Sequence, residues 1–278
     1  MTAVRRPSPA NQFSFSKVKA FQQCPLRYRY RYVEGRTEAF RSIESFVGTV
    51  AHEVLEWAYR ERDGGRTPEP AAAAERFSAL WDELWDGTVA IVRVDGTASD
   101  HLRRGREMVE RFVREVLPRD ASETLGLERR FTVRLDGGVV FTGIADRVGR
   151  TAKGTPFVVD YKTSASGGSY DEPENGLQAR LYAACLLREE ADRPVARAGF
   201  HYLVSGRTRW ETVRRIDGDG IWSRFLALVR EASGADEYPP RPGVLCAWCG
   251  FNAICPAARV PDELSGGLEL ARRPGPAG

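Results

Sequence analysis

Two stretches near the middle of the chain have the pattern of β-strands and end in charged residues. Residues 139–148 are rich in β-branched side chains, and residues 156–162 form an apolar run that ends in Asp-Tyr-Lys. Side chains alternate between the two faces of a strand, so Asp160 and Lys162 are predicted to point the same way. If the two strands pair, Asp146 lies beside Asp160. The sequence therefore predicts two carboxylates and one ammonium at one edge of a sheet.

The remaining hydrophobic pattern predicts helices around this sheet. Residues 24–35 alternate Arg and Tyr with the period of a strand, but the spacing of Leu26, Tyr30 and Val33 favours an amphipathic helix. Ser14 stands where an N-cap of the preceding helix is expected. Further helices are predicted at residues 46–62, 71–85, 99–117, 174–190 and 219–233, and further strands at 122–135, 197–205 and 208–216, with Asp136-Gly137-Gly138 as a hairpin turn.

This order of elements predicts one α/β domain with a mixed central sheet flanked by helices. Residues 1–12 are small and polar with two prolines, which is typical of disorder; the domain is expected to span residues 13–258, and 259–278 to form a flexible tail. No apolar run approaches the ~18 residues that a membrane helix needs. The N-terminus lacks the apolar segment of a signal peptide, so we expect a cytoplasmic protein with no membrane partner.

Charge is unevenly distributed along the chain. The net charge is only +3, but the first 41 residues carry nine basic side chains and two acidic ones, so that segment is +7 and the remainder is −4. A local basic patch with interleaved Arg and Tyr could neutralise and stack on nucleic acid. An ordinary amphipathic helix with arginines that extend to solvent explains the same pattern, and the sequence leaves both interpretations open.

Asp146, Asp160 and Lys162 have the chemistry of a divalent-cation site. Carboxylate oxygens are hard ligands that suit Mg²⁺ or Mn²⁺, and a lysine beside them can meet developing negative charge. An isolated Asp-x-Lys is more often an ion pair at the end of a strand, so the pattern is too short to decide alone.

Four more polar residues are considered together with these three. His52 lies on a predicted helix, where a lone histidine is more often structural than a ligand. Glu128 lies on the strand before the hairpin, and the pattern alone assigns it no role. Gln178 and Tyr182 are four residues apart and share one face of a helix.

The cysteines form a second constellation. Cys246, Cys249 and Cys255 follow one another closely near the C-terminus, and Cys24 stands 222 residues upstream of the first of them. This spacing is a poor match to a zinc ribbon, which offers two close pairs. Soft thiolates suit zinc or an iron–sulfur cluster, and the residues alone do not choose. Cys185 lies in an apolar helix and is expected to be a small buried hydrophobe.

In this order, the motifs resemble those of RecB-family nucleases of the PD-(D/E)XK superfamily, in the branch that carries an iron–sulfur cluster. The matching segments run from residue 14 to residue 256 in the family's order, each short and together specific. They are Ser14-Phe-Ser with Cys24-Pro25-Leu, Gly48-Thr-Val-Ala-His52, Gly143-Ile-Ala-Asp146-Arg, Val159-Asp160-Tyr-Lys162-Thr, Gln178-Ala-Arg-Leu-Tyr182, and Cys246-Ala-Trp-Cys249 with Cys255-Pro256.

The resemblance implies a restriction-endonuclease-like fold with the two chain ends joined at a [4Fe–4S] cluster on the four cysteines, zinc being the less favoured metal. It also implies a catalytic Mg²⁺ or Mn²⁺. Asp160 replaces the glutamate of many relatives with a shorter carboxylate that the family tolerates. The implied metal ligands are His52, Asp146, Asp160 and the Tyr161 carbonyl, and the implied catalytic residues are Asp146, Asp160, Lys162, Gln178 and Tyr182.

The expected function is hydrolysis of DNA phosphodiesters by a metal-dependent nuclease, in particular an exonuclease on single-stranded ends in DNA repair and recombination. A second possible function is that of a nuclease subunit that acts only with a helicase or a CRISPR-integration complex. The chain contains no Gly-Lys pair and hence no Walker A motif, so a motor would be a partner. A third is that of a catalytically silent DNA-binding module, which the intact His52, Asp146, Asp160 and Lys162 argue against.

Overall fold

A six-stranded mixed sheet forms the centre of the fold in this computed structural model, which describes residues 11–92, 96–164, 173–258 and 269–270. Antiparallel and parallel pairs both occur, so the predicted mixed sheet is confirmed. The strands are β4 (Glu123–Arg134), antiparallel to β5 (Val140–Arg150); β6 (Pro156–Lys162), antiparallel to the end of β5; β7 (Val195–Tyr202), parallel to β6; β8 (Arg207–Arg214), antiparallel to β7; and β1 (Gln12–Phe13), parallel to the start of β5.

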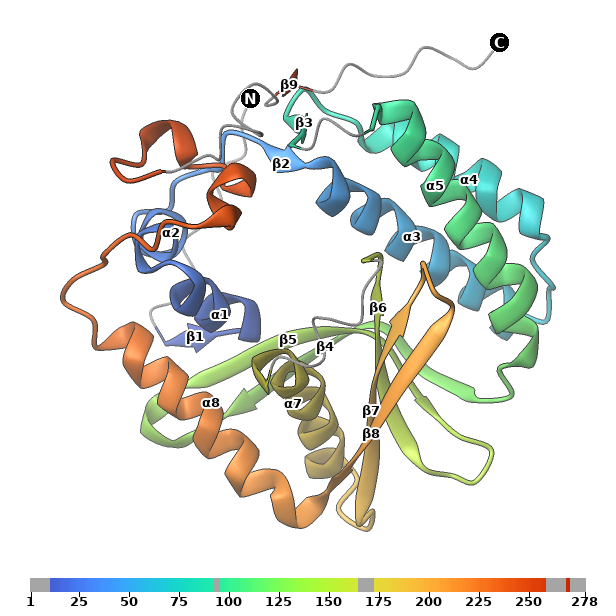
Figure 1. Cartoon of the computed structure of the whole chain (residues 1–278). Coiled ribbons are helices and arrows are strands. Elements are labelled where there is room, and N and C mark those ends of the chain that lie inside the picture. The colour runs from blue at the N-terminus through green and yellow to red at the C-terminus, as the bar shows by residue number, and fades with distance from the viewer. Residues whose placement is uncertain (1–10, 93–95, 165–172, 259–268, 271–278) are drawn as a thin grey trace.

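Helices cover both faces of this sheet (Figure 1). Val158 of β6 packs into one hydrophobic core with α7 and α8, whereas Val159 and Tyr161 pack into a second core with α3, α4 and α5. Adjacent residues of one strand thus supply opposite cores, as the alternation of side chains requires. The helices are α3 (Ile43–Asp63), α4 (Pro70–Leu84), α5 (Ala98–Arg111), α7 (Pro173–Glu189) and α8 (Gly218–Ser233).

The β4–β5 hairpin turns at Asp136-Gly137-Gly138, as predicted. Gly137 and Gly138 have φ of 68° and 74°, a region that glycine adopts without the steric cost of a Cβ. Through most of the hairpin, the paired residues are equidistant from Gly137; Phe131 pairs with Gly143, for example. The turn therefore sets the cross-strand partners far along both strands.

Helix α3 holds His52 over the sheet. It begins at Ile43, three residues before the predicted start, because the Ser42 hydroxyl accepts a hydrogen bond from the Ser45 N–H at 3.3 Å. Val50 and Val54 of this helix are fully buried in the second core. His52 lies on a helix that is 21 residues long and anchored by its apolar face, so its backbone is firmly positioned.

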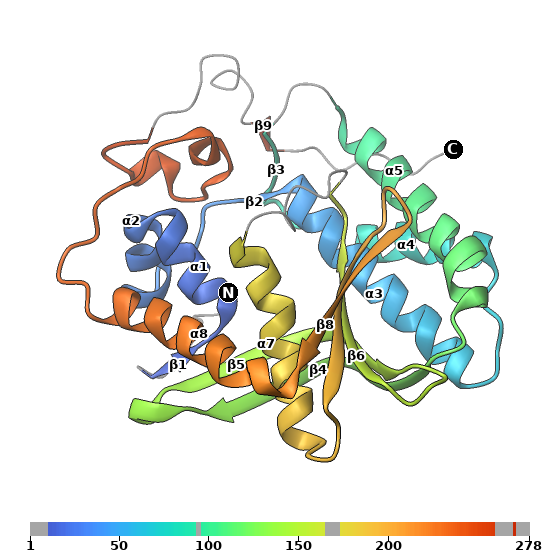
Figure 2. The ribbon, with the colours of Figure 1, turned by 60° about the horizontal axis from the view of Figure 1, so that its bottom comes forward.

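The N-terminal helices pack against the chain that follows α8. They are α1 (Phe15–Gln23) and α2 (Pro25–Tyr28), the latter continued by one π-helical turn. The Ser14 hydroxyl accepts from the Lys17 N–H at 3.2 Å, so the predicted N-cap is confirmed. Phe21 and Tyr28 contact each other edge to face, and Tyr28 stacks on Tyr238 with ring centroids 6.2 Å apart. Figure 2 shows α1 beside α8.

A second, three-stranded sheet was not predicted. It consists of β2 (Arg41–Ser42), β3 (Val89–Ile91) and β9 (Glu269–Leu270), which are too short to show a strand period. Of the segments expected to be disordered or flexible, residues 1–10, 259–268 and 271–278 lie outside the described residues. Within the described chain, no helix has the length and apolar character to cross a membrane.

Candidate metal centre and cysteine site

Asp146 and Asp160 come from paired strands. Arg147 lies opposite Val159 in the antiparallel register of β5 and β6, so Asp146 and Asp160 are the next residues of the two strands. The Tyr161 N–H donates to Asp146 Oδ2 at 2.6 Å and fixes that carboxylate. The strand pairing predicted from the sequence therefore brings the two acids together.

Lys162 forms an ion pair with Asp160 on the same face of β6. The Nζ–Oδ2 distance is 2.5 Å, and the ammonium also lies 5.0 Å from the centre of the Phe200 ring. Burial, followed by the charge of Asp146, raises the pKa of Asp160, although Lys162 opposes the shift. Burial lowers the pKa of Lys162, but the Asp160 carboxylate outweighs it and the net shift is upward. Lys162 is therefore held as a cation.

His52 reaches the same point from α3. Its Nδ1 lies 3.4 Å from Asp146 Oδ1, and its Nε2–H donates to the Tyr161 carbonyl at 2.9 Å. Burial lowers the pKa of His52, but the charge and hydrogen bond of Asp146, with Asp160 and the carbonyl, raise it to about 9. The imidazole is thus surrounded by groups that attract a positive charge.

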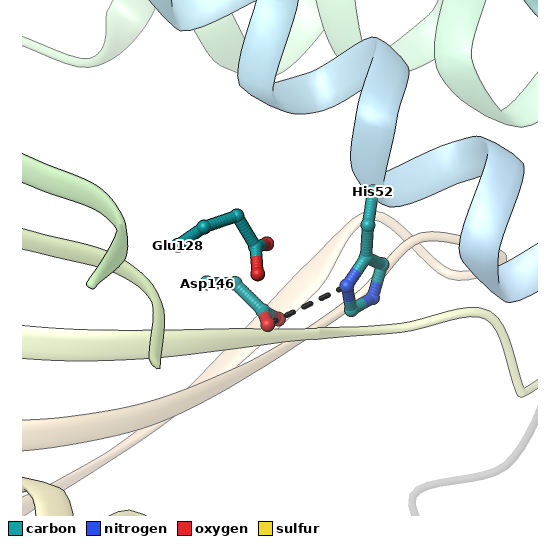
Figure 3. Close-up of side chains that lie close together, drawn as sticks. All are labelled: His52, Glu128 and Asp146. Atoms are coloured by element: carbon teal, nitrogen blue, oxygen red, sulfur yellow. Dashed lines mark ion pairs between the residues drawn. The ribbon is translucent and has the colours of Figure 1, made fainter. Parts of the chain in front are cut away.

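Glu128 completes a compact group with His52 and Asp146. One ligand atom from each of the three residues lies within 4.8 Å of the other two. Figure 3 shows the three side chains pointing toward one another from β4, β5 and α3. Burial, and next the charge of Asp146, raises the pKa of Glu128 to about 7.

The hairpin contained the signal that could have located Glu128. Glu128 and Asp146 each stand nine residues from Gly137, one on each side of the predicted turn. Equidistant residues of a hairpin are cross-strand partners and share a face. Counting outward from the turn would therefore have placed this acid beside Asp146.

These donors fit a divalent cation that prefers oxygen. The carboxylates of Asp146, Glu128 and Asp160, the Tyr161 carbonyl and the His52 imidazole are of the type that binds Mg²⁺ or Mn²⁺. Among the described residues, Asp160 is not in the compact group, because its carboxylate lies against Lys162. The sequence predicted His52, Asp146, Asp160 and the Tyr161 carbonyl as ligands, and the structure places Glu128 beside two of them.

Gln178 and Tyr182 lie on one face of α7, as predicted. The Gln178 amide is 3.5 Å from the Tyr182 hydroxyl. Burial raises the pKa of Tyr182, with smaller contributions from the charges of Asp160 and Asp146. The Tyr182 ring is buried and stacks on Phe131, so this residue belongs to the core as well as to the edge of the site.

The four cysteines predicted to act together line one cavity of about 320 Å³. Cys24 lies between α1 and α2, and the other three lie in the C-terminal segment beside α2 (Figure 1). In the described part of the chain, no three of these thiols have their sulfurs within 4.8 Å of one another. Cys185 is buried in the core on α7 and does not line the cavity. The members of the cavity site are Cys24, Cys246, Cys249 and Cys255.

The arginines of the N-terminal helical segment are partly neutralised. Glu38 pairs with Arg27 at 2.9 Å and lies 3.6 Å from Arg31, and Glu34 pairs with Arg29 at 2.6 Å. The charge that this segment can offer to a polyanion is therefore smaller than its arginine count suggests.

With this geometry established, comparison with known proteins identifies the family. The profile of the PD-(D/E)XK nuclease superfamily matches residues 12–256, so the chain belongs to that superfamily. The matched span includes the metal-site residues and all four cavity cysteines. The mixed sheet flanked by helices is the restriction-endonuclease-like fold expected from the sequence.

Individual relatives are more distant. Over 129 positions, this chain is 28% identical to a subunit of the ATP-dependent helicase/deoxyribonuclease of Streptococcus agalactiae serotype Ia, and equally to its counterpart in serotype V. Each match covers 44% of this chain and 12% of the relative's length. A solved structure described as SSO0001 aligns with 92% of this chain and 90% of its own, at 17% identity and a TM-score of 0.41.

Proposed function

We propose that this domain is a divalent-metal-dependent deoxyribonuclease, and more specifically an exonuclease on single-stranded DNA ends in repair or recombination. The observation that carries the proposal is the convergence of His52, Asp146, Asp160 and Lys162 in a chain of the PD-(D/E)XK nuclease superfamily. Mg²⁺ or Mn²⁺ would be held by His52, Asp146, Asp160 and the Tyr161 carbonyl. When bound, the ion would supply charge to neutralise the scissile phosphate.

The protein's own groups perform the remaining tasks. Lys162 is held as a cation by Asp160, so it can stabilise the negative charge that develops on the phosphate oxygens. Gln178 and Tyr182 would position the nucleic acid, since both lie on the helix face that approaches the acids.

The cleavage experiment compares wild type with Asp160→Ala and Lys162→Ala. Substrates are end-labelled linear and circular single-stranded DNA, with Mg²⁺ or Mn²⁺. We expect Asp160→Ala to abolish cleavage while DNA binding is retained, and Lys162→Ala to lose about 10²-fold or more in rate. Asp192→Ala is the matched control, because its side chain is 80% exposed. Undiminished cleavage by both site variants would refute the assignment, and cleavage of circles would refute the exonuclease.

A second candidate function is that of a nuclease subunit that works with a helicase. The name of the Streptococcus agalactiae relatives favours it, because that name combines both activities. Two further candidates are a partner in a CRISPR-integration complex and a silent DNA-binding module. Co-purification from the native host distinguishes a partner-dependent enzyme, and the Mn²⁺ cleavage assay distinguishes the silent module.

We further propose that the four cavity cysteines hold a [4Fe–4S] cluster. The observation that supports a shared ligand site is that Cys24 and the three C-terminal cysteines, far apart in the sequence, line one cavity of about 320 Å³. The choice of an iron–sulfur cluster over zinc rests on the resemblance of the motifs. Iron, sulfide and zinc analysis of anaerobically purified protein tests this directly: stoichiometric zinc without iron would refute the cluster.

A further inference from the structure

Glu128 has an unusual backbone for a residue in a strand. Its φ is +46°, and it is the one non-glycine residue with positive φ in the part of the chain that the structure describes. Such a conformation is sterically unfavourable for a residue with a Cβ and persists only where the surroundings impose it. Here the pairs on either side, Leu127 with Arg147 and Arg129 with Ala145, hold both flanks of the distortion in register.

Most of the charged groups around Glu128 are acidic, so a cation bound there would be stabilised. The groups that act on it are Asp146, Glu56 and Glu53, all acidic, together with the His52 imidazole. Among the ion pairs of the described residues, none joins Glu128 to a lysine or arginine. Although Glu128 is exposed, one of its carboxylate oxygens lies within 4.8 Å of a ligand atom of Asp146 and of His52.

The acids at this edge therefore fall into two groups. Asp160 has the ammonium of Lys162 at 2.5 Å, whereas Asp146 has the His52 imidazole and the Tyr161 N–H, and no described ion pair joins Asp146 or Glu128 to a lysine or arginine. The second group is the one in which a divalent cation would relieve the most repulsion, since two carboxylates and one nitrogen already converge on one point.

We propose that Glu128 is a further ligand of the divalent cation, together with His52 and Asp146. This inference rests on the metal site of the proposed function and adds to it a carboxylate from β4. It predicts that the ion is bound on the β4 side of Asp146, so that the affinity for metal depends on Glu128 even in the absence of DNA.

The test measures Mn²⁺ binding without nucleic acid, by titration calorimetry or by the electron paramagnetic resonance of free Mn²⁺. Glu128→Gln keeps the shape and removes the charge, and we expect its Mn²⁺ affinity to fall at least tenfold. Glu128→Gly accepts the positive φ and lacks the ligand, so it should fall equally while it folds without backbone strain. A loss in both variants therefore cannot be a folding defect.

Glu56→Gln is the matched control, because Glu56 lines the same small pocket but is paired with Arg60 at 2.5 Å. It should change the affinity by less than threefold. Without metal, Glu128→Gln should also melt at a higher temperature than wild type, because repulsion with Asp146 is removed. Wild-type Mn²⁺ affinity in both Glu128 variants would overturn the proposal. Mn²⁺ binding that depends on Glu128 in a protein that cuts no DNA would instead refute the nuclease and leave this ligand standing.

Discussion

Gly143 touches Tyr182 so closely that a Cβ at position 143 would lie 2.3 Å from Tyr182 Cε1. Both residues belong to motifs described in the sequence analysis, and their contact explains why β5 carries a glycine three residues before Asp146. Because Gly143 has no side chain, β5 and α7 can pack closely at this point. The packing of the core thus fixes the place of Asp146 relative to the helix that bears Gln178.

Substituting Gly143→Ala should therefore destabilise the fold. We expect a loss of about 1–3 kcal/mol in the free energy of unfolding, the usual cost of overpacking, measured by urea denaturation. Gly48→Ala is the control, since its Cβ would meet Thr163 Oγ1 at an ordinary 3.5 Å and alanine favours a helix. In a Tyr182→Ala background the cost of Gly143→Ala should largely disappear. An equal cost in both backgrounds would contradict the contact.

Arg147 is the largest buried cation of the described chain, and it anchors the start of β4. Its side chain is 2% exposed and pairs with Asp120 at 2.8 Å, while Ser122 accepts another of its hydrogen bonds. Arg147→Met should lower the free energy of unfolding by about 3 kcal/mol, because Asp120 loses the closer of its two arginine partners. Arg129→Met, which breaks an exposed pair with Glu189, should cost less than about 1 kcal/mol.

The Arg147 effect should depend on pH. Burial raises the pKa of Asp120, but Arg147 and Ser122 outweigh it and the net shift is downward. A carboxyl with a lowered folded-state pKa stabilises the protein above its unfolded pKa, about 3.9, and loses that contribution as pH falls through the folded value. The stability gap between wild type and Arg147→Met should thus be constant from pH 7 to 5 and shrink below pH 4. A gap that widens in acid would exclude Asp120 as the cause.

The N-terminal arginines should contribute to DNA binding through their charge. Replacing Arg27, Arg29 and Arg31 together by Gln should flatten the dependence of DNA affinity on salt, since each neutralised phosphate releases counterions. Because Glu34 and Glu38 already pair with them, we expect a change of slope by about one to two contacts instead of three. The control replaces three exposed arginines of α5 and its extension, and should leave the slope unchanged: Arg103, Arg106 and Arg114. An identical slope in wild type and the N-terminal triple variant would show that those arginines do not contact the DNA phosphates.

Cys24 should matter for stability more than for chemistry. A group held by Cys24 and the C-terminal cysteines closes nearly the whole chain into a loop, and closing a loop of that size restrains the unfolded chain by roughly 5 kcal/mol. Many domains have a total stability of about 5–15 kcal/mol. If the group is the proposed cluster, the wild-type protein is brown, and Cys24→Ser should bleach it, lower its melting temperature and promote aggregation. Cys185→Ser should keep the colour, because Cys185 is buried in the core on α7. A Cys24→Ser protein that stays brown and equally stable would remove Cys24 from the site.

The sequence predicted most of the fold because the central strands and the long helices have clear periods. The shared face of Asp160 and Lys162 followed from strand alternation, and the place of Asp146 beside Asp160 followed from the expected pairing of the two strands. The strands of the small sheet could not be found, because a two-residue strand such as Arg41–Ser42 is defined by its partner and not by its own pattern.

Glu128 lies 18 residues from Asp146 in sequence, and the register set by the predicted turn at Gly137 brings the two together, so the sequence held the information to place it. The ion pairs of Glu34 and Glu38 could not be predicted, since they depend on how the chain turns after the π-helical segment. Local patterns thus indicated which residues are candidates for the site, whereas tertiary pairing decided which of them lie close together.

The parallel pairing of β1 with β5, and the stacking of Tyr28 on Tyr238, have a consequence for synthesis of the chain. The first described helices find their partners only after the last ones have been made. On a ribosome that adds about 5–20 residues per second, this segment waits on the order of tens of seconds with Phe21 and its neighbours uncovered. During this time the exposed apolar side chains of the nascent chain can bind chaperones. A nonsense mutation before α8 should leave an N-terminal segment that cannot fold.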